Sequence, residues 1–348
     1  MYNICVKRLV FTGGHHTGAL EVAKKLQSDG WHIVWFGHRH TMWGEKADSG
    51  EYREVTAAGI KFIDLKAGKF YRTFHPLKLV RIPYGFFQAL FQLIVLRPSG
   101  IVSFGGYLAV PTVIAGWLLG IPAITHEQTV VAGWANKLIC LIARKIAITW
   151  PQSAGNYPKS KVIVIGLPLR EDIKKIRNPK SEIRNLVYVT GGKQGSHVIN
   201  EAVFAALSQL LKKYTVIHQT GFADFPRASE IKDSHYQAFD FSSSQAISAL
   251  AQAEVVVGRS GAHTTYELGF LGKKSVLIPI TSASHNEQYL NAQLLADSSL
   301  AIILPQSHLT PQSLIASIAS AQKLSPHKLN LADDATDKLV QLIKQQFS

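Results

Sequence analysis

Residues 8–36 have the sequence RLVFTGGHHTGALEVAKKLQSDGWHIVWF, in which two apolar runs flank a glycine turn and an amphipathic segment. The runs at residues 8–11 and 32–36 are rich in branched and aromatic side chains, which is typical of buried strands. Between them, residues 17–28 place apolar side chains at helical spacing, and Gly30 suits the position after a helix end. A strand, a helix and a second strand in this order predict a parallel sheet.

The same alternation continues through the 348 residues and restarts once. Further strand patterns occur at residues 62–65, 100–104, 123–126, 145–149, 162–165, 186–190, 215–219, 255–258 and 275–279. A stretch rich in Pro, Ser, Gly and Asn, residues 151–158, indicates a linker. We therefore expect an α/β protein with two Rossmann-like, doubly wound parallel-sheet domains and a cleft between them. The expected bounds are 1–156 for the first domain, 157–330 for the second, and 331–348 for a final helix that packs back on the first.

The composition narrows the class of protein. Hydrophobic residues make up 47% of the chain and charged residues 17%, which favours folded domains over disorder. Cys5 and Cys140 lie far apart in sequence and predict neither a disulfide framework nor a cysteine-ligated metal. The net charge of +14 indicates an anionic partner. Charge alone does not distinguish a nucleic acid from an anionic lipid or a phosphorylated substrate.

Three glycine-bearing turns follow predicted strands: TGGH at residues 12–15, FGGY at 104–107 and TGGKQG at 190–195. Glycine permits close backbone approach, and a helix that starts at such a turn presents N–H groups to an anion. The carboxyl ends of parallel strands form the edge where ligands bind in open α/β sheets. Neither GxGxxG nor GxxxxGK[ST] is present, which disfavours a nicotinamide dehydrogenase and a P-loop nucleotidase.

The second half contains the segment RSGAHTTYE, residues 259–267, where a strand pattern runs through small residues into a helix. This turn suits a phosphate at the helix N-terminus, with the hydroxyls of Ser260, Thr264 and Thr265 as donors. Glu267 suits a ribose diol, from which it can accept two hydrogen bonds. A helix cap with a solvated glutamate is the alternative interpretation.

A second helical segment, NEQYLNA at residues 286–292, follows downstream. Gln288 and Asn291 stand one helical turn apart and can share a face. Their amide groups suit the hydroxyls of a sugar, although such residues also cap helices.

These segments together resemble the MurG family of glycosyltransferases over nearly the whole chain. The family's blocks appear in order as TGGH at 12–15, FGGYLAVPTVIAGWLLGIPAITHEQ at 104–128, GLPLR at 166–170, GGKQGSHVIN at 191–200, RSGAHTTYE at 259–267 and NEQYLNA at 286–292. Members transfer N-acetylglucosamine from its UDP donor to lipid I in peptidoglycan synthesis. The resemblance implies the GT-B fold, with UDP-GlcNAc and a lipid-linked diphosphate sugar as substrates.

The resemblance also implies roles for individual residues. The acceptor side is expected to include Thr12, Gly13, Gly14, Gly105, Gly106 and Tyr107. The donor side is expected to include Thr129, Arg170, Lys193, Ser242, Ala262, His263, Thr264, Thr265, Glu267 and Gln288. Of these, Arg170 would reach the diphosphate, the backbone near Ser242 would meet the uracil, and Glu267 would hold the ribose. Gln288 would contact the transferred sugar.

Three features depart from the family's pattern. The family's first loop carries more glycine, where this chain has Val10 and Phe11 before Thr12. HEQ is followed by Thr129, where the family has an asparagine that contacts the sugar. Lys193 stands where a serine is usual, and it can pair with a phosphate or stay solvated. Thr129 leaves the identity of the transferred sugar open.

Transfer with inversion needs a base for the acceptor hydroxyl. His15 is the candidate, because an imidazole readily takes up a proton near neutral pH. His16 beside it leaves an ambiguity, and His126 and Glu127 are further candidates. The chain has no Asp-x-Asp motif, so we expect chemistry without a metal or other cofactor.

Residues 69–91 have the sequence KFYRTFHPLKLVRIPYGFFQALF, where apolar side chains are mixed with Lys69, Arg72, Lys78 and Arg81. This composition fits an interfacial segment that dips apolar groups into lipid and presents cations to anionic head groups. Since the implied acceptor is lipid-linked, we expect a peripheral protein at the cytoplasmic face of the cell membrane. An ordinary loop and helix packed on the first domain is the alternative.

Two further function classes stay open. A UDP-sugar 2-epimerase of GT-B fold would share the donor site but needs no membrane segment. A non-catalytic homologue that binds sugar nucleotides is the other. Nucleic-acid binding rests on net charge alone and is not expected.

Overall fold

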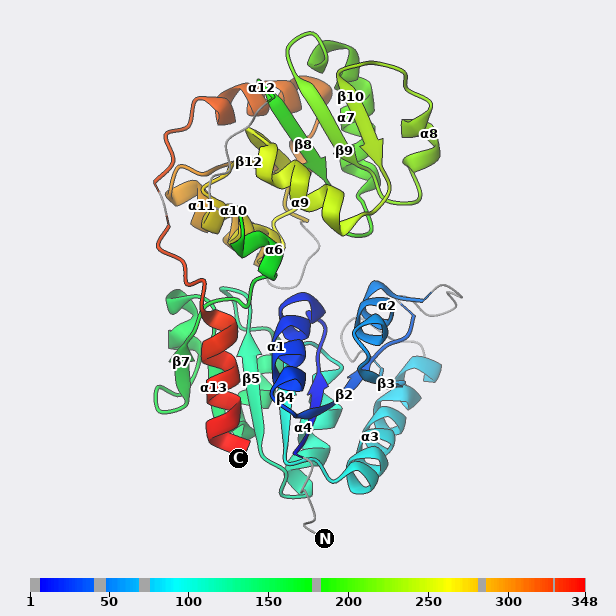
Figure 1. Cartoon of the computed structure of the whole chain (residues 1–348), viewed down its shortest axis with the longest axis vertical. Helices are drawn as coiled ribbons and strands as arrows, with labels where there is room; N and C mark the ends of the chain where they lie inside the picture. The colour runs from blue at the N-terminus through cyan, green and yellow to red at the C-terminus, as the bar shows by residue number, and fades with distance from the viewer. Residues whose placement is uncertain are drawn as a thin grey trace. The chain divides into compact units, whose positions relative to one another are not determined.

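Two compact units make up the chain in the computed structural model (Figure 1). The structure describes residues 7–40, 48–68, 76–176, 183–280, 286–327 and 329–347, with the backbone alone at 76–80. Met1–Arg170 and Ala332–Ser348 form the first unit, and Glu171–Leu331 form the second. Each unit has one parallel sheet with helices, as the α/β prediction requires.

The first unit has a seven-stranded sheet in the order β3-β2-β1-β4-β5-β6-β7. Its strands are β1 (Arg8–Thr12), β2 (His32–Gly37), β3 (Lys61–Asp64), β4 (Gly100–Ser103), β5 (Ala123–Glu127), β6 (Lys145–Ile148) and β7 (Val162–Val164). Its helices are α1 (His16–Ser28), α2 (Gly50–Ala57), α3 (Pro76–Leu96), α4 (Ala109–Leu118), α5 (Trp134–Ile142), the 3-10 helix η1 (Pro151–Asn156) and α13 (Ala335–Phe347). Among the described residues, no helix combines the length and apolar character needed to cross a bilayer.

Alternation along the strands divides the core of the first unit into two layers. Leu9 and Phe11 of β1 join the apolar cluster of α1, α2 and α13 on one face of the sheet. Val10 between them joins the cluster of α3, α4 and α5 on the other face. All three side chains are fully buried, so both faces bury apolar surface, which is the main driving force of folding.

The first unit extends past its expected boundary. Residues 151–158, expected to be a linker, contain η1, where Ser153 is buried. Strand β7 then pairs with β6, with Val162 opposite Ile146. The boundary expected after residue 156 is therefore wrong, and the chain leaves the first unit after Arg170. Pro, Ser, Gly and Asn suit a 3-10 turn as well as a linker, so composition did not separate the two.

Helix α13 completes the first unit by packing on α1. Leu339 and Ile343 are fully buried in the same apolar cluster as the inner side of α1. On the surface, Nζ of Lys344 lies 2.8 Å from a carboxylate oxygen of Asp29, next to the end of α1. The last 17 residues of the chain (332–348) therefore belong to the unit that the first residues begin.

The second unit has a six-stranded sheet in the order β10-β9-β8-β11-β12-β13. Its strands are β8 (Leu186–Thr190), β9 (Thr215–Gln219), β10 (Tyr236–Phe239), β11 (Val255–Gly258), β12 (Lys274–Leu277) and β13 (Ala301–Ile303). Its helices are α6 (Glu171–Lys174), α7 (His197–Leu210), α8 (Phe225–Ser229), α9 (Ser243–Gln252), α10 (Ala262–Leu271), α11 (Glu287–Asp297), the 3-10 helix η3 (Gln306–His308) and α12 (Pro311–Gln322). Helices α7 and α12 cover one face of this sheet through a shared apolar cluster.

Both sheets reverse their strand order beside their first strand. In the first unit the reversal lies between β1 and β4, and in the second it lies between β8 and β11. This is the Rossmann order, in which ligands bind at the carboxyl ends of the strands that flank the reversal. The fold therefore gives each unit one switch point where a ligand is expected.

We expect Phe347→Ala to lower the free energy of unfolding of the first unit by about 3–5 kcal/mol, as is typical for deleting a buried phenyl ring. Phe347 is 6% exposed, and its ring packs against Gly100 of β4. All six tryptophans lie in the first unit, so their fluorescence during urea unfolding reports on that unit. Gln345→Ala, at an exposed position of α13, is the control. Equal destabilisation by both variants would contradict a specific role for the ring.

Candidate functional site

The glycine loops at residues 12–15 and 104–107 meet at the switch point of the first sheet. The amide of Gly14 donates to the carbonyl of Gly105 over 3.2 Å. A Cβ on Gly13 would lie 2.8 Å from that carbonyl oxygen, and Gly13 has φ +137°, so the approach requires glycine. The structure thereby brings together the two loops that carry the expected acceptor residues Thr12, Gly13, Gly14, Gly105, Gly106 and Tyr107.

His15 immediately precedes α1, and its side chain makes no capping hydrogen bond. Its backbone carbonyl accepts from Nε2 of Gln128 over 3.4 Å, which brings the end of β5 to the first glycine loop. The neighbouring His16 pairs with Glu54, with 3.1 Å between Nε2 and Oε2. Because that contact engages His16, His15 is the better candidate for the base.

His126 is a core residue. It is fully buried, its Nε2 lies 3.0 Å from the carbonyl oxygen of Gly166, and its ring meets Phe104 edge to face at 5.8 Å. Burial lowers the pKa of His126 to about 4, so its ring is neutral at neutral pH. This geometry gives His126 a packing role rather than the proton-transfer role considered from the sequence.

Glu127 is the centre of a buried hydrogen-bond network at the end of β5. Its carboxylate accepts from the backbone amide of Thr129 at 3.1 Å, from Nδ2 of Asn136 at 2.7 Å and from the hydroxyl of Tyr157 at 2.8 Å. Thr129 is 3% exposed, and its hydroxyl lies 2.7 Å from the carbonyl oxygen of Val131. In this conformation Thr129 makes its hydrogen bonds inside its own loop, which argues against the expected contact with a donor sugar.

The glycine loop at residues 190–195 stands at the switch point of the second sheet. The hydroxyl of Thr190 accepts from the amide of Gly192 at 3.0 Å, and Nε2 of Gln219 donates to the carbonyl of Gly192 at 3.0 Å. A Cβ on Gly258, the last residue of β11, would lie 2.8 Å from the carbonyl oxygen of Thr190. The ends of β8 and β11 therefore touch through their backbones, as the two loops do in the first unit.

Arg259 joins the ends of three strands in the second sheet, a role that the sequence did not reveal although the residue heads the RSGA turn. Its guanidinium donates to Oγ of Ser196, beyond β8, and to the carbonyl of Ile278, beyond β12, each over 2.9 Å. Burial lowers the pKa of Arg259, yet a guanidinium stays charged at neutral pH. Ser196 precedes α7, whose start has no side-chain cap. A fixed cation beside an uncapped helix start suits an anion.

Helix α10 starts directly after Ser260 and Gly261. Gly261 offers no side-chain cap, and a Cβ at this position would meet no atom of the described residues within 4 Å, so those residues leave the space before the helix open. Thr264 is half-buried in the first turn, whereas Ser260 and Thr265 are fully buried. A phosphate can therefore use Thr264 and the backbone amides of residues 262–264. The buried hydroxyls of Ser260 and Thr265 do not fit the donor role expected of them.

The residues expected to hold the ribose and the sugar differ in exposure. Glu267 of α10 is 6% exposed. Oε1 of Gln288 accepts from the amide of Ile280 at 3.0 Å, and the N–H groups of Gln288 have no partner within the described part of the chain. Asn291 is 1% exposed and donates to the carbonyl of Ser260 at 3.2 Å. Asn291 thus attaches α11 to the turn before α10, while Gln288 keeps donors for a ligand.

The remaining expected residues take varied positions. Tyr107 packs its ring against His38 with 5.9 Å between centroids, and burial raises the pKa of Tyr107 to about 12. The hydroxyl of Ser242 accepts from a backbone amide to cap α9, so its side chain serves the fold. Lys193 is half-buried in its glycine loop, and Arg170 is the last residue of the first unit.

One group of metal-ligand side chains stands together within the described residues: His197, Glu201 and Asp224. Asp224 already accepts from His197 at 2.9 Å and from Asn200 at 2.7 Å. Arg227 pairs with Glu201 at 2.5 Å. These partners satisfy the carboxylates without an ion, and the charge of Arg227 opposes a cation there.

The sequence matches two family models. Residues 11–148 match the glycosyltransferase family 28 N-terminal domain. Residues 186–347 match the glycosyltransferase family 28 C-terminal domain. The matches fall on the two sheets and cover both switch points.

Named proteins extend the similarity. The UDP-N-acetylglucosamine–N-acetylmuramyl-(pentapeptide) pyrophosphoryl-undecaprenol N-acetylglucosamine transferase 2 of Bacillus cereus is 32% identical over 326 residues, which are 89% of this chain and 90% of that protein. The crystal structure of MurG from Acinetobacter baumannii matches with a TM-score of 0.70 at 26% identity, over 97% of this chain and 99% of that one. UDP-GlcNAc 2-epimerase from Methanocaldococcus jannaschii matches with a TM-score of 0.62 over 97% and 99% of the chains. At 11% identity, this last likeness shows a common fold alone.

As the pH falls from 7 to 5, we expect the free energy of unfolding of the first unit to shift by about 2 kcal/mol in favour of His126→Asn, relative to the unmodified protein. The folded pKa of His126, about 4, lies below its unfolded value of 6.5. Its stabilisation is therefore fully present above pH 6.5 and is lost as the pH falls, because the unfolded chain binds the proton first. Buried Glu51, with its pKa raised to about 7, acts in the opposite direction but is common to both proteins. Urea unfolding followed by tryptophan fluorescence measures the difference, and an equal pH dependence in the two proteins would contradict a neutral buried imidazole.

Proposed function

The chain belongs to glycosyltransferase family 28, and from this membership we propose that it transfers N-acetylglucosamine from UDP-N-acetylglucosamine to lipid I, the undecaprenyl-diphosphate-linked N-acetylmuramyl pentapeptide. The product is lipid II of peptidoglycan synthesis. Relatives 32–33% identical over 89–90% of the chain carry this activity in their names. The observation that carries the proposal is the pair of Rossmann-type switch points, where α1, α7 and α10 start without side-chain caps.

In this proposal the second unit binds the donor. Strands β8 and β11 are neighbours, so the starts of α7 and α10 that follow them offer backbone N–H groups to one diphosphate. Arg259 and Lys193 add positive charge at these loops. Thr264 offers a hydroxyl, Glu267 suits the ribose, and the N–H groups of Gln288 suit hydroxyls of the sugar.

The first unit binds the acceptor diphosphate at the loops 12–15 and 104–107 and supplies His15 as the base. The acceptor hydroxyl oxygen attacks the anomeric carbon while the bond from that carbon to the UDP oxygen breaks. UDP leaves with the electron pair, His15 takes the hydroxyl proton, and the single displacement inverts the configuration. Fixed charge and helix ends stabilise the leaving diphosphate, so we propose no metal ion or other cofactor.

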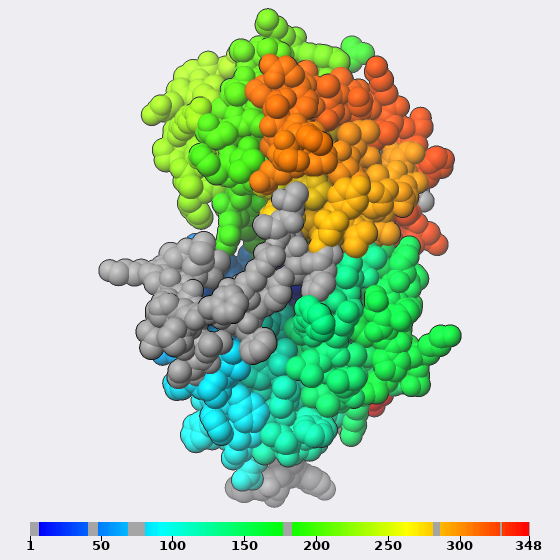
Figure 2. Space-filling model, turned by 180° about the vertical axis from the view of Figure 1, so that it is seen from behind, coloured from blue at the N-terminus to red at the C-terminus, as the bar shows by residue number. Residues whose placement is uncertain are grey.

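Three neighbouring helices of the first unit expose large apolar side chains. The exposed residues are Tyr84, Phe87, Phe91, Ile94 and Val95 on α3, Trp117 and Leu118 on α4, and Trp134, Leu138 and Leu141 on α5. Helix α4 packs between α3 and α5 on one face of the sheet, and Figure 2 shows α3 in cyan and α4 in teal at the surface. Lys137 lies over the ring of Trp134 at 5.2 Å. An apolar surface with cations at its edge suits an anionic membrane, so we propose a peripheral protein at its cytoplasmic face.

The basic residues expected in the interfacial segment are only partly described. Lys69 and Arg72 lie outside the described residues, as does the side chain of Lys78. Arg81 is half-buried on α3. The membrane proposal therefore rests on the exposed apolar side chains of α3, α4 and α5 together with the net charge of +14.

The alternative functions are less well supported. The epimerase likeness is limited to fold at 11% identity, whereas the family 28 models match both units. The substrate of an epimerase is a water-soluble sugar nucleotide, so this activity would not explain the exposed apolar side chains of α3, α4 and α5. Anionic lipid and diphosphate substrates account for the basic charge, so no nucleic-acid partner is proposed.

We expect the purified protein to convert UDP-GlcNAc and lipid I to lipid II and UDP, with or without EDTA. His15→Ala should lower kcat by about 10²–10⁴-fold, because it removes the base, and leave the KM for UDP-GlcNAc unchanged. His16→Ala is the matched control. Because the ring of His16 already contacts the carboxylate of Glu54, this variant should retain most of the kcat of the unmodified protein. Chromatographic separation of radiolabelled lipid II from the sugar nucleotide measures both variants.

Three results would count against parts of this proposal. An epimerised sugar nucleotide as the sole product would contradict transfer. UDP binding without turnover of any acceptor would support a non-catalytic homologue. Activity lost in EDTA and restored by Mg²⁺ would contradict metal-independent chemistry.

We expect the double variant Phe87→Ser/Phe91→Ser to bind anionic vesicles at least tenfold more weakly than the unmodified protein. The two rings are 63% and 62% exposed, and burying each contributes on the order of 1 kcal/mol. Phe222→Ser, at a ring 58% exposed in the second unit, is the control and should bind normally. Vesicle flotation measures binding, which rising salt should weaken by screening. An unmodified protein that does not float at low salt would contradict the membrane proposal.

A further inference from the structure

Helix α3 has two faces with different partners. Its inner side carries Gly85, Ala89 and Leu93 at four-residue spacing, and all three are buried. Its outer side carries the exposed rings of Phe87 and Phe91. The buried side therefore fixes the helix to the first unit, and the exposed side is available to a partner.

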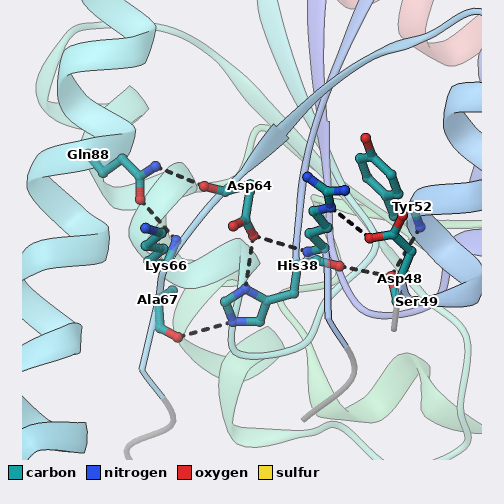
Figure 3. A network of polar contacts seen from close by, with 9 residues as sticks. His38, Asp48, Ser49, Tyr52, Asp64, Lys66, Ala67 and Gln88 are labelled. Atoms are coloured by element: carbon teal, nitrogen blue, oxygen red, sulfur yellow. Dashed lines mark hydrogen bonds and ion pairs between the residues drawn. The ribbon is translucent and has the colours of Figure 1, made fainter. Parts of the chain in front are cut away.

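Gln88 attaches α3 to the segment that follows β3. Its Oε1 accepts from the amide of Lys66 at 2.9 Å, and its Nε2 donates to the carbonyl of Asp64 at 2.8 Å (Figure 3). Strand β3 is the edge strand of the sheet, so the side-chain amide satisfies backbone groups that have no neighbouring strand on that side. Because the oxygen and the nitrogen of the Gln88 amide each bond to this segment, α3 can neither slide along the segment nor move away from it without losing a hydrogen bond.

Gly85, one turn before Gln88, shows how closely the two elements approach. A Cβ on Gly85 would lie 2.6 Å from Cα of Ala67. The backbone of α3 therefore rests directly on the segment 64–67, and a displacement of one would displace the other.

The segment 64–67 in turn holds His38, at the end of β2. The ring Nε2 of His38 lies 3.2 Å from the carbonyl oxygen of Ala67, and its Nδ1 lies 3.7 Å from a carboxylate oxygen of Asp64 (Figure 3). The same carboxylate oxygen accepts from the amide of Arg39 at 3.0 Å. The imidazole is thus held from both of its nitrogens.

The ring of His38 packs against Tyr107, with 5.9 Å between ring centroids. Tyr107 directly follows Gly105 and Gly106 in the glycine loop that meets the loop of His15. A continuous series of contacts therefore runs from the helix with the exposed apolar side to the switch point of the first sheet.

We propose that Gln88 and His38 are positioning residues. They fix the position, relative to α3, of the glycine loop 104–107 to which the acceptor diphosphate is proposed to bind. The inference rests on the proposed lipid-linked acceptor. Such an acceptor has its polyprenyl chain in the membrane and its diphosphate at the glycine loops, so one molecule must satisfy two sites at a fixed separation. Fixing that separation in the protein favours the reactive geometry, because misplacement of a bound substrate slows its reaction.

The test replaces Gln88 by methionine, which keeps the side-chain length and removes both hydrogen bonds. Gln92→Met, one turn later on α3, is the control, since Gln92 has no hydrogen bond within the described residues. With lipid I in vesicles, Gln88→Met should raise the KM for the acceptor about five- to tenfold. The KM for UDP-GlcNAc and the affinity for empty vesicles should not change, and the KM for a water-soluble short-chain acceptor should rise less than that for lipid I in vesicles. Gln92→Met should leave all four values unchanged.

Hydrogen exchange gives a readout that needs no transfer activity. In Gln88→Met, the amides of residues 64–67 and of the glycine loop 104–107 should both exchange faster than in Gln92→Met. Faster exchange at 64–67 alone would overturn the link to Tyr107. An unchanged KM for the vesicle-bound acceptor, or an equal rise for both acceptors, would overturn the positioning role. A protein that transfers to neither acceptor would contradict the proposed function, and the exchange result would still decide whether Gln88 controls the loop.

Discussion

Backbone contact without side chains, at the point where each sheet reverses its strand order, is the constraint on which the rest of the structure depends. Gly13 and Gly105 meet there in the first unit, and Gly258 and Thr190 meet in the second. A single Cβ would force each pair apart and carry the following helix with it. Because the N–H groups at a helix start are directional, such a shift would change what anion they can reach. The ability of both units to bind an anion thus depends on the lack of a side chain at Gly13 and Gly258.

Loops built on glycine lose much conformational entropy on folding, and buried polar groups stabilise them here. In the first unit, the carboxylate of Glu127 is held by neutral donors from Thr129, Asn136 and Tyr157. In the second unit, a charged group has the same effect, since Arg259 links the ends of three strands. The guanidinium of Arg259 lies where a diphosphate is proposed to bind, whereas the carboxyl group of Glu127 is buried inside the first unit.

The strand and helix alternation and the glycine turns predicted both sheets, apart from the edge strands β10 and β13, and the residues at their switch points, because these features depend on local sequence. The domain boundary depended on β7, a three-residue strand whose place is fixed by pairing with β6. A sugar-binding role for Asn291 followed from side-chain chemistry, and one for Thr129 followed from the family resemblance. Whether such a group faces a ligand or its own fold depends on partners such as Ser260, which lies 31 residues before Asn291. The sequence predicted that α3 is apolar. It did not predict which side of α3 is exposed, because that depends on which side chains pack on the sheet.

The position of α13 has a consequence for synthesis on the ribosome. The first unit begins with the first residues but is completed by the last 17 (332–348), which include one wall of its core. The second unit is contiguous in sequence, so it can fold while the chain is still being made. The amino-terminal sheet must meanwhile keep the α1 side of its core uncovered until α13 has been synthesised. A chain released before α13 is made would therefore carry a folded second unit attached to an incomplete first unit.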